Sequence, residues 1–153
     1  MLITNPIDKR EAPALLQAWH WLVEQEATIL VVSVFGDLFL QYPNESVYWL
    51  DTGTGDLTRL AANVAEFQAL LQQPENAAYW LLPDLANEAQ QTGLAPGPHE
   101  VYSFILLPVL GGEYTPENLR PTHLQAHLNL TGVLNEQIRN LPDGTKVTFQ
   151  VTE

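Results

Sequence analysis

Residues 36–60 constrain the fold of this chain more than any other stretch. Three short segments of strand-forming residues alternate here with turn signals, which are Gly36-Asp37, Pro43-Asn44-Glu45-Ser46 and Gly53-Thr54-Gly55-Asp56. Glycine and asparagine tolerate the left-handed backbone of tight reversals, and proline presets the geometry of a turn. The stretch therefore predicts three antiparallel strands joined by short turns. It carries no nucleophile motif, metal-binding cluster or phosphate-binding loop, so it predicts a fold and no chemistry.

Hydrophobic periodicity predicts helices and further strands on both sides of this region. Residues 28–35 (TILVVSVF) are apolar throughout and rich in β-branched residues, which is typical of a strand covered on both faces. The most regular helix is expected at residues 122–140, where a mostly apolar stripe recurs every three or four positions. The other expected elements are a helix that starts after Asp8, helices at 63–71 and 75–92, and strands at 101–107 and 146–152.

Capping residues mark several of these helix ends. Asp8 with Glu11, and Asn63 with Glu66, have the spacing at which a cap and the third helical residue satisfy each other's backbone. The helical stretch 75–92 contains Pro83, which should interrupt it. The remaining expectations are that Asp84 caps the second piece and that Gly93 ends it.

The order of the elements predicts an α+β fold, a mostly antiparallel twisted sheet with helices packed on it. A chain of 153 residues fits one domain that buries roughly two thirds of its unfolded surface. The turn Ala95-Pro96-Gly97-Pro98 is the best internal boundary. We therefore expect a single unit over residues 1–153, with two halves at 1–94 and 95–153 as the alternative.

Charge and composition exclude several classes of function. The net charge is −12, from eighteen acidic and six basic residues, and such a surface repels phosphate backbones. We therefore expect no nucleic-acid partner. No apolar run is long enough for a bilayer span and the N-terminus lacks a signal-peptide pattern, so we expect no membrane partner. The absence of cysteine fits a reducing cytoplasm.

Candidate catalytic and metal-binding groups are weak. His123 and His127 could share one helical face, but they lack the glutamate of a zinc-protease helix and the third and fourth ligands that zinc needs. No serine lies in a Gly-x-Ser-x-Gly elbow, and Gly53-Thr54-Gly55 is too short for a phosphate-binding loop. Asp51 and Asp56 flank that glycine turn and are expected to accept its backbone N–H groups. We expect no enzyme, cofactor or metal.

Protein binding is the better use of the charged and aromatic residues. The loop at 111–118 combines two glycines with acids beside an aromatic side chain, and tyrosine and tryptophan are enriched in interfaces. The bland alternative is a turn that only positions the following helix. The candidate partner-binding residues are Glu113, Tyr114 and Glu117 of this loop, together with Asp37, Asp51 and Asp56 of the strand turns.

Two segments resemble a bacterial protein family. Gly36-Asp37-Leu38-Phe39 through Val47-Tyr48-Trp49-Leu50-Asp51-Thr52, with Gly55 and Glu66-Phe67, is similar to the GAD-like N-terminal part of type VI secretion immunity proteins. The second segment resembles the C-terminal immunity domain of that family, which was formerly of unknown function. It comprises Pro98-His99-Glu100-Val101-Tyr102-Ser103-Phe104, Leu110-Gly111-Gly112-Glu113-Tyr114 and Glu117-Asn118-Leu119. The resemblance implies a cytoplasmic, non-enzymatic protein that binds and neutralises a DNase toxin delivered between competing bacteria.

Charge agrees with this implication, because a DNase presents a cationic face to DNA and an acidic inhibitor can compete for that face. Two alternatives stay open. The chain could be an acidic adaptor or regulator with an unrelated protein partner. It could also be a small enzyme or metal protein, in which case His123, His127 and an acid should line one pocket. Its oligomeric state is not indicated by the sequence.

Overall fold

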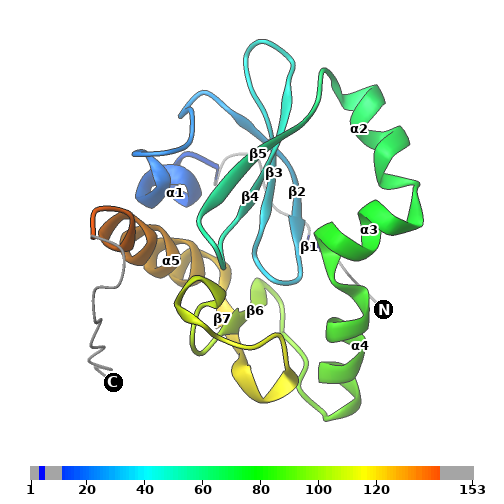
Figure 1. Cartoon of the computed structure of the whole chain (residues 1–153), viewed down its shortest axis with the longest axis vertical. Coiled ribbons are helices and arrows are strands. Elements are labelled where there is room, and N and C mark those ends of the chain that lie inside the picture. Colours follow the sequence, from blue (N-terminus) through cyan, green and yellow to red (C-terminus); the bar gives the residue numbers. More distant parts are fainter. Residues whose placement is uncertain (1–3, 6–11, 142–153) are drawn as a thin grey trace.

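The structure is a computed structural model that describes residues 4–5 and 12–141. Its two sheets are antiparallel and helices pack around them, so the predicted α+β class is confirmed (Figure 1). The first sheet has the order β1-β2-β3-β4-β5, and β6 pairs with β7 in the second. The strands are β1 Thr4–Asn5, β2 Thr28–Ser33, β3 Leu38–Gln41, β4 Val47–Asp51, β5 Asp56–Ala61, β6 Glu100–Phe104 and β7 Leu119–His123.

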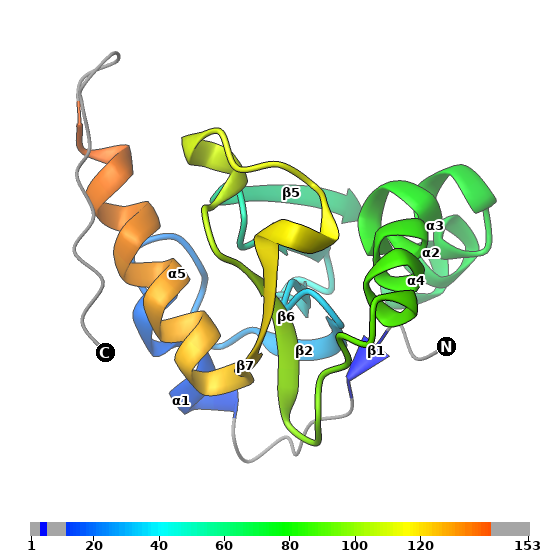
Figure 2. The ribbon, with the colours of Figure 1, turned by 90° about the horizontal axis from the view of Figure 1, so that it is seen from below.

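Helices cover both faces of the five-stranded sheet (Figure 2). The α-helices are α1 Ala12–Leu16, α2 Val64–Leu71, α3 Pro74–Leu81, α4 Pro83–Gln91 and α5 Leu124–Arg139, and short 3₁₀ turns lie at Gln17–Trp19, Pro108–Leu110 and Pro116–Asn118. Residues of α1 and α5 share a core with Leu38 and Leu50 on one face, and Phe67 and Trp80 from α2 and α3 pack on Phe39 on the other. Both faces of β2 are therefore covered, as its apolar run predicts.

The meander of residues 36–60 is confirmed. Strands β3, β4 and β5 pair in sequence, with Leu38 opposite Leu50 and Leu50 opposite Leu57. The chain reverses between β2 and β3 at Gly36, whose φ is +76°, and Gly55 has a φ of +78° in the turn before β5. These left-handed positions are the ones for which glycine costs least.

Two predicted caps are confirmed, at opposite ends of the helical region. The Asn63 side chain accepts a hydrogen bond from the Glu66 N–H at 2.8 Å and starts α2. Gly93, with φ +87°, follows α4, and Leu94 N–H donates to the Ala89 carbonyl, which is the Schellman ending of a helix. The caps assigned to Asp8 and Glu11 lie outside the described residues, as does the strand predicted at 146–152.

The predicted cap at Asp84 is wrong. Leu82, at φ +49°, both follows α3 and precedes α4, and no side chain caps the new helix. Pro83 occupies its first position, where a missing N–H costs nothing. Asp84 lies in the first turn of α4 instead. The helical stretch is interrupted at Pro83 as predicted, but the left-handed Leu82 makes the break and no aspartate caps α4.

The strand β7 was missed, and the helix predicted at 122–140 begins at Leu124. Residues 119–123 pair with β6, with Pro121 opposite Tyr102. A proline is tolerated there because β7 lies at the edge of a two-stranded sheet. The strand predicted at 101–107 is also shorter, since β6 ends at Phe104 and Leu107 leads into a 3₁₀ turn.

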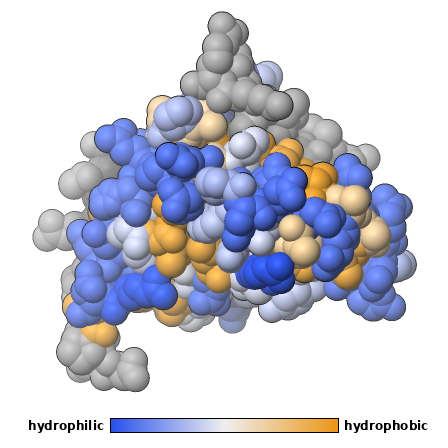
Figure 3. Space-filling model, turned by 90° about the horizontal axis from the view of Figure 1, so that it is seen from above, coloured by the Kyte–Doolittle hydropathy of each residue, from blue (hydrophilic) through white to orange (hydrophobic). Residues whose placement is uncertain are grey.

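The second sheet is fixed to the first next to the β2–β3 turn. Tyr102 N–H donates to the Val34 carbonyl at 2.7 Å, and Phe35 packs against Tyr102 and Phe104. This contact brings the loop after β6 close to the end of the sheet at which β2 turns into β3. Polar side chains cover most of the face drawn in Figure 3, with apolar groups between them. No helix among the described residues is long and apolar enough to cross a bilayer.

Candidate partner-binding site

The β2–β3 turn places the carboxyl group of Asp37 inside the protein. Ser33 Oγ accepts hydrogen bonds from the N–H groups of Phe35 and Asp37, both at 3.2 Å, and Gly36 supplies the left-handed backbone. Asp37 Oδ1 then accepts from the backbone N–H of Thr52 at 3.0 Å and from its hydroxyl at 2.9 Å. Asp37 Oδ2 lies 3.4 Å from Trp49 Nε1. Asp37 is only 7% exposed, so this carboxyl group is buried.

The β4–β5 turn brings two further acids beside it. Asp51 Oδ1 accepts from Gly53 N–H at 2.9 Å and from Thr54 N–H at 3.3 Å. The expectation that Asp51 accepts backbone hydrogen bonds is therefore confirmed. The Asp56 side chain accepts no such bond from the described residues, and Asp56 instead donates through its own N–H to Thr54 Oγ1. Asp51 and Asp56 are direct cross-strand partners, a position in which like charges destabilise a sheet.

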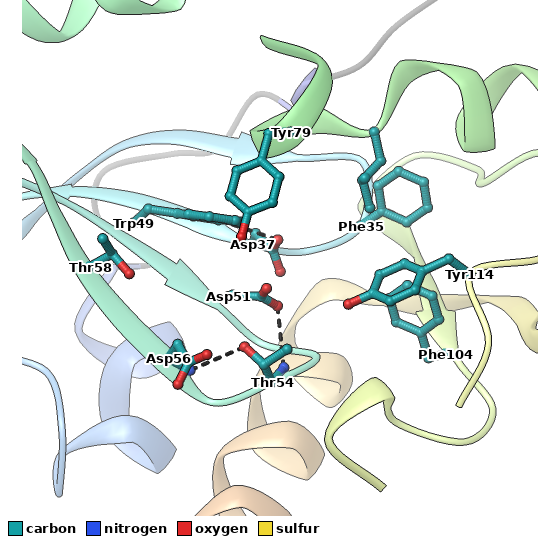
Figure 4. A pocket seen from close by; sticks show the side chains of 11 residues that line it. Phe35, Asp37, Trp49, Asp51, Thr54, Asp56, Thr58, Tyr79, Phe104 and Tyr114 are labelled. Atoms are coloured by element: carbon teal, nitrogen blue, oxygen red, sulfur yellow. Dashed lines mark hydrogen bonds between the residues drawn. The ribbon is translucent and has the colours of Figure 1, made fainter. Parts of the chain in front are cut away.

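These three acids line a cavity of about 350 Å³, which we call the acidic pocket (Figure 4). The Tyr114 hydroxyl points toward the centre of this pocket, where the carboxyl groups of Asp37 and Asp51 lie. The lining comes from the β2–β3 turn, from β4, β5 and the turn between them, from α3 and the residue after it, and from the end of β6 and the loop that follows. It consists of Phe35, Asp37, Trp49, Asp51, Thr54, Asp56, Thr58, Tyr79, Leu82, Phe104 and Tyr114.

Burial shifts the proton equilibria of the pocket. Loss of hydration raises the pKa of Asp37 to about 8, and the neighbouring charge of Asp51 adds to the effect. Burial also raises the pKa of Asp51, although the N–H groups of Gly53 and Thr54 oppose it. Burial and the nearby carboxylates raise the pKa of Tyr114 to about 12. The pocket is therefore an environment in which negative charge is poorly compensated.

The described residues supply no cation to this pocket. Residues 12–141 contain three arginines and no lysine. Arg59 donates to Ser46 Oγ, the Arg139 guanidinium lies over the Trp21 ring, and Arg120 sits in β7 opposite Ser103. Within that part of the chain, the carboxylates of the pocket have only neutral hydrogen-bond donors around them.

Behind the pocket, a buried hydrogen-bond network joins the two sheets to α5. His127 Nε2 lies 3.0 Å from Thr52 Oγ1, and Ser103 Oγ lies 2.6 Å from His127 Nδ1. Since the Thr52 hydroxyl donates to Asp37, the geometry assigns the proton of the ring to Nε2. Burial lowers the pKa of His127 to about 4, so the ring is neutral at pH 7. The network holds the Asp37–Thr52 contact in place.

The structure places four of the six predicted site residues in one pocket: Asp37, Asp51, Asp56 and Tyr114. Glu113 and Glu117 do not line it. Their loop is held by Asn118, whose side chain donates to the carbonyls of Leu106 and Glu113, both at 2.9 Å, and accepts from Leu106 N–H. The loop therefore orients Tyr114 toward the pocket and leaves the two glutamates beside it.

Sequence reasoning missed the walls of the pocket and the network behind it. Tyr79 lies in a predicted helix, and Trp49, Phe35 and Phe104 lie in predicted strands, so none of them was marked as part of a site. The sequence does contain a pattern that indicates the buried network. His127, Thr131 and Asn135 recur every four residues on α5 and are all buried, which marks a polar stripe within the apolar face. His123 lies apart from it, because its Nδ1 accepts from Gln125 N–H at the start of α5.

A metal site is not formed by these groups. Among the described residues no group of three or more His, Asp or Glu side chains is arranged to hold a metal ion. His127 faces Thr52 and Ser103, and His123 caps its helix, so the two histidines and an acid do not line one pocket. The pocket's chemistry is that of carboxyl groups between aromatic rings, which suits an organic cation.

The raised pKa of Asp37 predicts how stability depends on pH. The folded protein holds a proton on Asp37 up to about pH 8, whereas the unfolded chain releases it near 3.8. Stability should therefore fall as the pH rises between these values, by up to roughly 1.4 kcal/mol per pH unit for this group. Thermal melts of wild type and Asp37→Asn from pH 5 to pH 9 test this. The wild type should lose more stability than the variant on going to pH 9, and parallel curves would contradict the assignment.

Comparison with known proteins finds a family model that matches part of the chain. Residues 61–135 match the family model described as "T6SS immunity protein Tdi1, C-terminal". The match runs from the end of β5 into α5, and so crosses the turn at Ala95-Pro96-Gly97-Pro98. No curated protein matches the sequence.

A solved structure shares the fold. It is titled "Crystal structure of Atu4351 from Agrobacterium tumefaciens", superposes with a TM-score of 0.56, and is 14% identical in sequence. The alignment covers 83% of this chain and 65% of the other, so the present chain spans about two thirds of that protein. At this identity the likeness concerns the fold alone.

Proposed function

We propose that the chain binds and neutralises a basic DNase toxin, the effector, because residues 61–135 match the C-terminal domain model of a type VI secretion immunity family. The family match itself implies a protein partner. That the effector is a DNase, and that an acidic surface binds it, are the further steps of the proposal. The family match is the observation that carries it.

Electrostatics supports a nuclease as the target. An enzyme that cleaves DNA must hold a phosphate backbone, so its active face is rich in lysine and arginine. A chain with eighteen acidic and six basic residues presents the opposite potential, which accelerates encounter and disfavours wrong partners. Binding at that face would exclude DNA without any chemical step, so the proposed mechanism is non-enzymatic occlusion.

The acidic pocket supports a location for the contact. Asp37, Asp51 and Asp56 are gathered there without a cation from residues 12–141, and the half-exposed Tyr114 stands beside them. Aromatic anchors next to desolvated charges are typical of the centre of an interface. We place the centre of the interface at this pocket, with Glu113 and Glu117 in its rim.

The proposal extends to the location of the protein, its cofactors and its domain organisation. The protein would act in the cytoplasm, where an intoxicating DNase meets its substrate, and would need no cofactor, nucleic acid or membrane. Both halves of the chain would act as one unit. The contacts of His127 with Thr52 and Ser103 support this, because they join residues from before and after the Ala95–Pro98 turn.

Growth rescue tests the function. Expression of the proposed effector should kill a host cell, and co-expression of this chain should restore growth. Failure to rescue growth, with both proteins present, would contradict the proposal. An acidic adaptor or regulator with an unrelated partner is the alternative, and a gene neighbourhood without a secreted toxin would favour it.

Salt dependence tests the electrostatic part separately. Exposed charges are screened within about 8 Å at physiological ionic strength and within about 3 Å at 1 M. The association rate constant with the effector should therefore fall at least about tenfold between low salt and 0.5 M NaCl. The dissociation rate constant should change much less. Stopped-flow mixing measures both rate constants, and an association rate constant that does not change with salt would indicate an apolar interface.

A further inference from the structure

We propose that the acidic pocket is a receptor for one guanidinium group, and that an arginine side chain of the effector occupies it. The inference rests on the proposed function for the source of the arginine, whereas the pocket's selectivity for a guanidinium group can be tested without any effector. It goes beyond a general acidic surface because it names one site and one chemical group.

The carboxyl groups supply the acceptors. Asp37 is buried, and its Oδ2 has a single, long contact, 3.4 Å from Trp49 Nε1. Both backbone hydrogen bonds to Asp51 go to its Oδ1. Asp37, whose second oxygen is weakly engaged, and Asp51, whose Oδ2 takes neither of these backbone bonds, thus face one cavity together with Asp56. A guanidinium group has five N–H donors in a planar fork that can reach more than one carboxylate.

The aromatic rings supply stacking surfaces on two sides. Trp49 and Tyr79 form an edge-to-face pair with centroids 5.5 Å apart, and Phe104 and Tyr114 form another at 5.2 Å. Tyr79 is 69% exposed and Tyr114 48% exposed, so a large part of each tyrosine is not covered by the protein. Planar guanidinium groups stack on such rings, and cation–π contacts stabilise them further when water is excluded.

Other occupants fit less well. Anions are repelled by the ionised carboxylates of the pocket, and the described side chains form no metal-holding cluster. A lysine ammonium is a compact, strongly hydrated charge that cannot stack or bridge two carboxylates in a plane. A cavity of about 350 Å³ admits a long side chain rather than a whole peptide segment. The geometry therefore favours arginine over lysine.

Uptake of a cation should expel a proton from Asp37. The raised pKa of this residue means that it is largely protonated at pH 7, and a bound cation stabilises the ionised form instead. Affinity should therefore increase as the pH rises toward 8 and then level off. The titratable groups that face Asp37 from the surrounding elements are Asp51, Asp56, Tyr79, Tyr114 and, through Thr52, His127.

The test uses N-acetyl-arginine amide titrated into the full-length protein, followed by tryptophan fluorescence and NMR. The neutral isostere N-acetyl-citrulline amide and N-acetyl-lysine amide are the matched ligands. We expect saturable binding of the arginine compound, at least about tenfold tighter than either of the others. Absence of saturation, equal affinity for citrulline amide, or equal affinity for lysine amide would each overturn the assignment of a guanidinium group.

Two variants localise the binding. Asp51→Asn keeps an oxygen for the turn but removes the charge, and should weaken binding of arginine amide at least about fivefold. Glu26→Gln, an exposed acid before β2, is the control and should leave the affinity unchanged. Wild-type affinity should rise about fivefold to tenfold from pH 6.5 to pH 8.5, and Asp37→Asn should remove this dependence. Equal affinities in all variants, or a flat pH profile in the wild type, would contradict the proposal.

Failure of this inference and failure of the proposed function give different results. If the effector binds tightly but arginine amide does not saturate the pocket, the guanidinium assignment fails and the immunity function stands. If arginine amide binds selectively but no effector is neutralised, the pocket stands and the immunity function fails.

Discussion

Replacement of Gly36 by alanine should destabilise the protein by about 3 kcal/mol or more, among the largest effects expected of one methyl group. Gly36 has a φ of +76°, and a Cβ atom there would lie 2.3 Å from both Cδ2 and Nε2 of His127. His127 is 1% exposed and held by Thr52 and Ser103, so it cannot move away without losing buried hydrogen bonds. The backbone strain and the steric clash therefore both contribute to the loss of stability.

Gly93→Ala is the matched control. Gly93 has a φ of +87°, and no atom lies within 4 Å of the position that its Cβ would occupy. This variant should lose only the stability that a left-handed alanine costs, about 1–2 kcal/mol. Urea denaturation of both variants gives the difference, which measures how closely His127 approaches the turn that carries Asp37. Equal losses would contradict the buried network behind the pocket.

The double variant Asp51→Asn, Asp56→Lys should weaken effector binding at least about 100-fold. It removes one carboxylate inside the acidic pocket and reverses the charge of another at its edge. The side-chain amide oxygen introduced at position 51 can still accept the N–H groups of Gly53 and Thr54, so the turn should persist. An effector cation would then lose an acceptor and meet a positive charge, whose like-charge repulsion costs several kcal/mol when desolvated.

The matched control is Glu24→Gln, Glu26→Lys. It changes the net charge by the same amount, and both acids are exposed residues just before β2, at the other end of that strand from Gly36. Isothermal titration of the effector with both variants separates local contacts from overall charge. The control should lose only a few-fold in affinity. Similar losses in both variants would mean that net charge, and not the pocket, determines binding.

Local patterns predicted most of the fold because they depend on neighbouring residues. The turns at Gly36 and Gly55, the cap at Asn63 and the helix end at Gly93 all follow from backbone preferences within a few positions. The strand β7 could not be predicted in this way, because Pro121 disfavours a strand and the segment becomes one only through its pairing with β6. The cap at Asp84 failed for a similar reason, since the left-handed Leu82 lets Pro83 start the helix.

The site was only partly predictable. Asp37, Asp51 and Asp56 could be singled out as acids at turns, yet their convergence depends on the register of β3, β4 and β5. The contribution of Tyr79 depends on how α3 packs over Trp49, and that of Phe104 on the attachment of β6 to Val34. Such contacts join residues far apart in sequence, and no local pattern encodes them.

The role of His127 shows the same limit. Its spacing from His123 suggested at most a metal pair that lacked further ligands. In the structure it is a buried, neutral ring between Thr52 and Ser103. The polar stripe of His127, Thr131 and Asn135 was visible in the sequence, but its partners, such as the Thr52 carbonyl that accepts from Asn135 Nδ2 at 3.0 Å, lie on other elements.

A crystal structure of the complex with the proposed effector tests the central claim most directly. Our account predicts an arginine of the toxin within hydrogen-bond distance of Asp37 or Asp51, between the rings of Trp49 and Tyr114. An interface elsewhere on the molecule, with this pocket open to solvent, would contradict it.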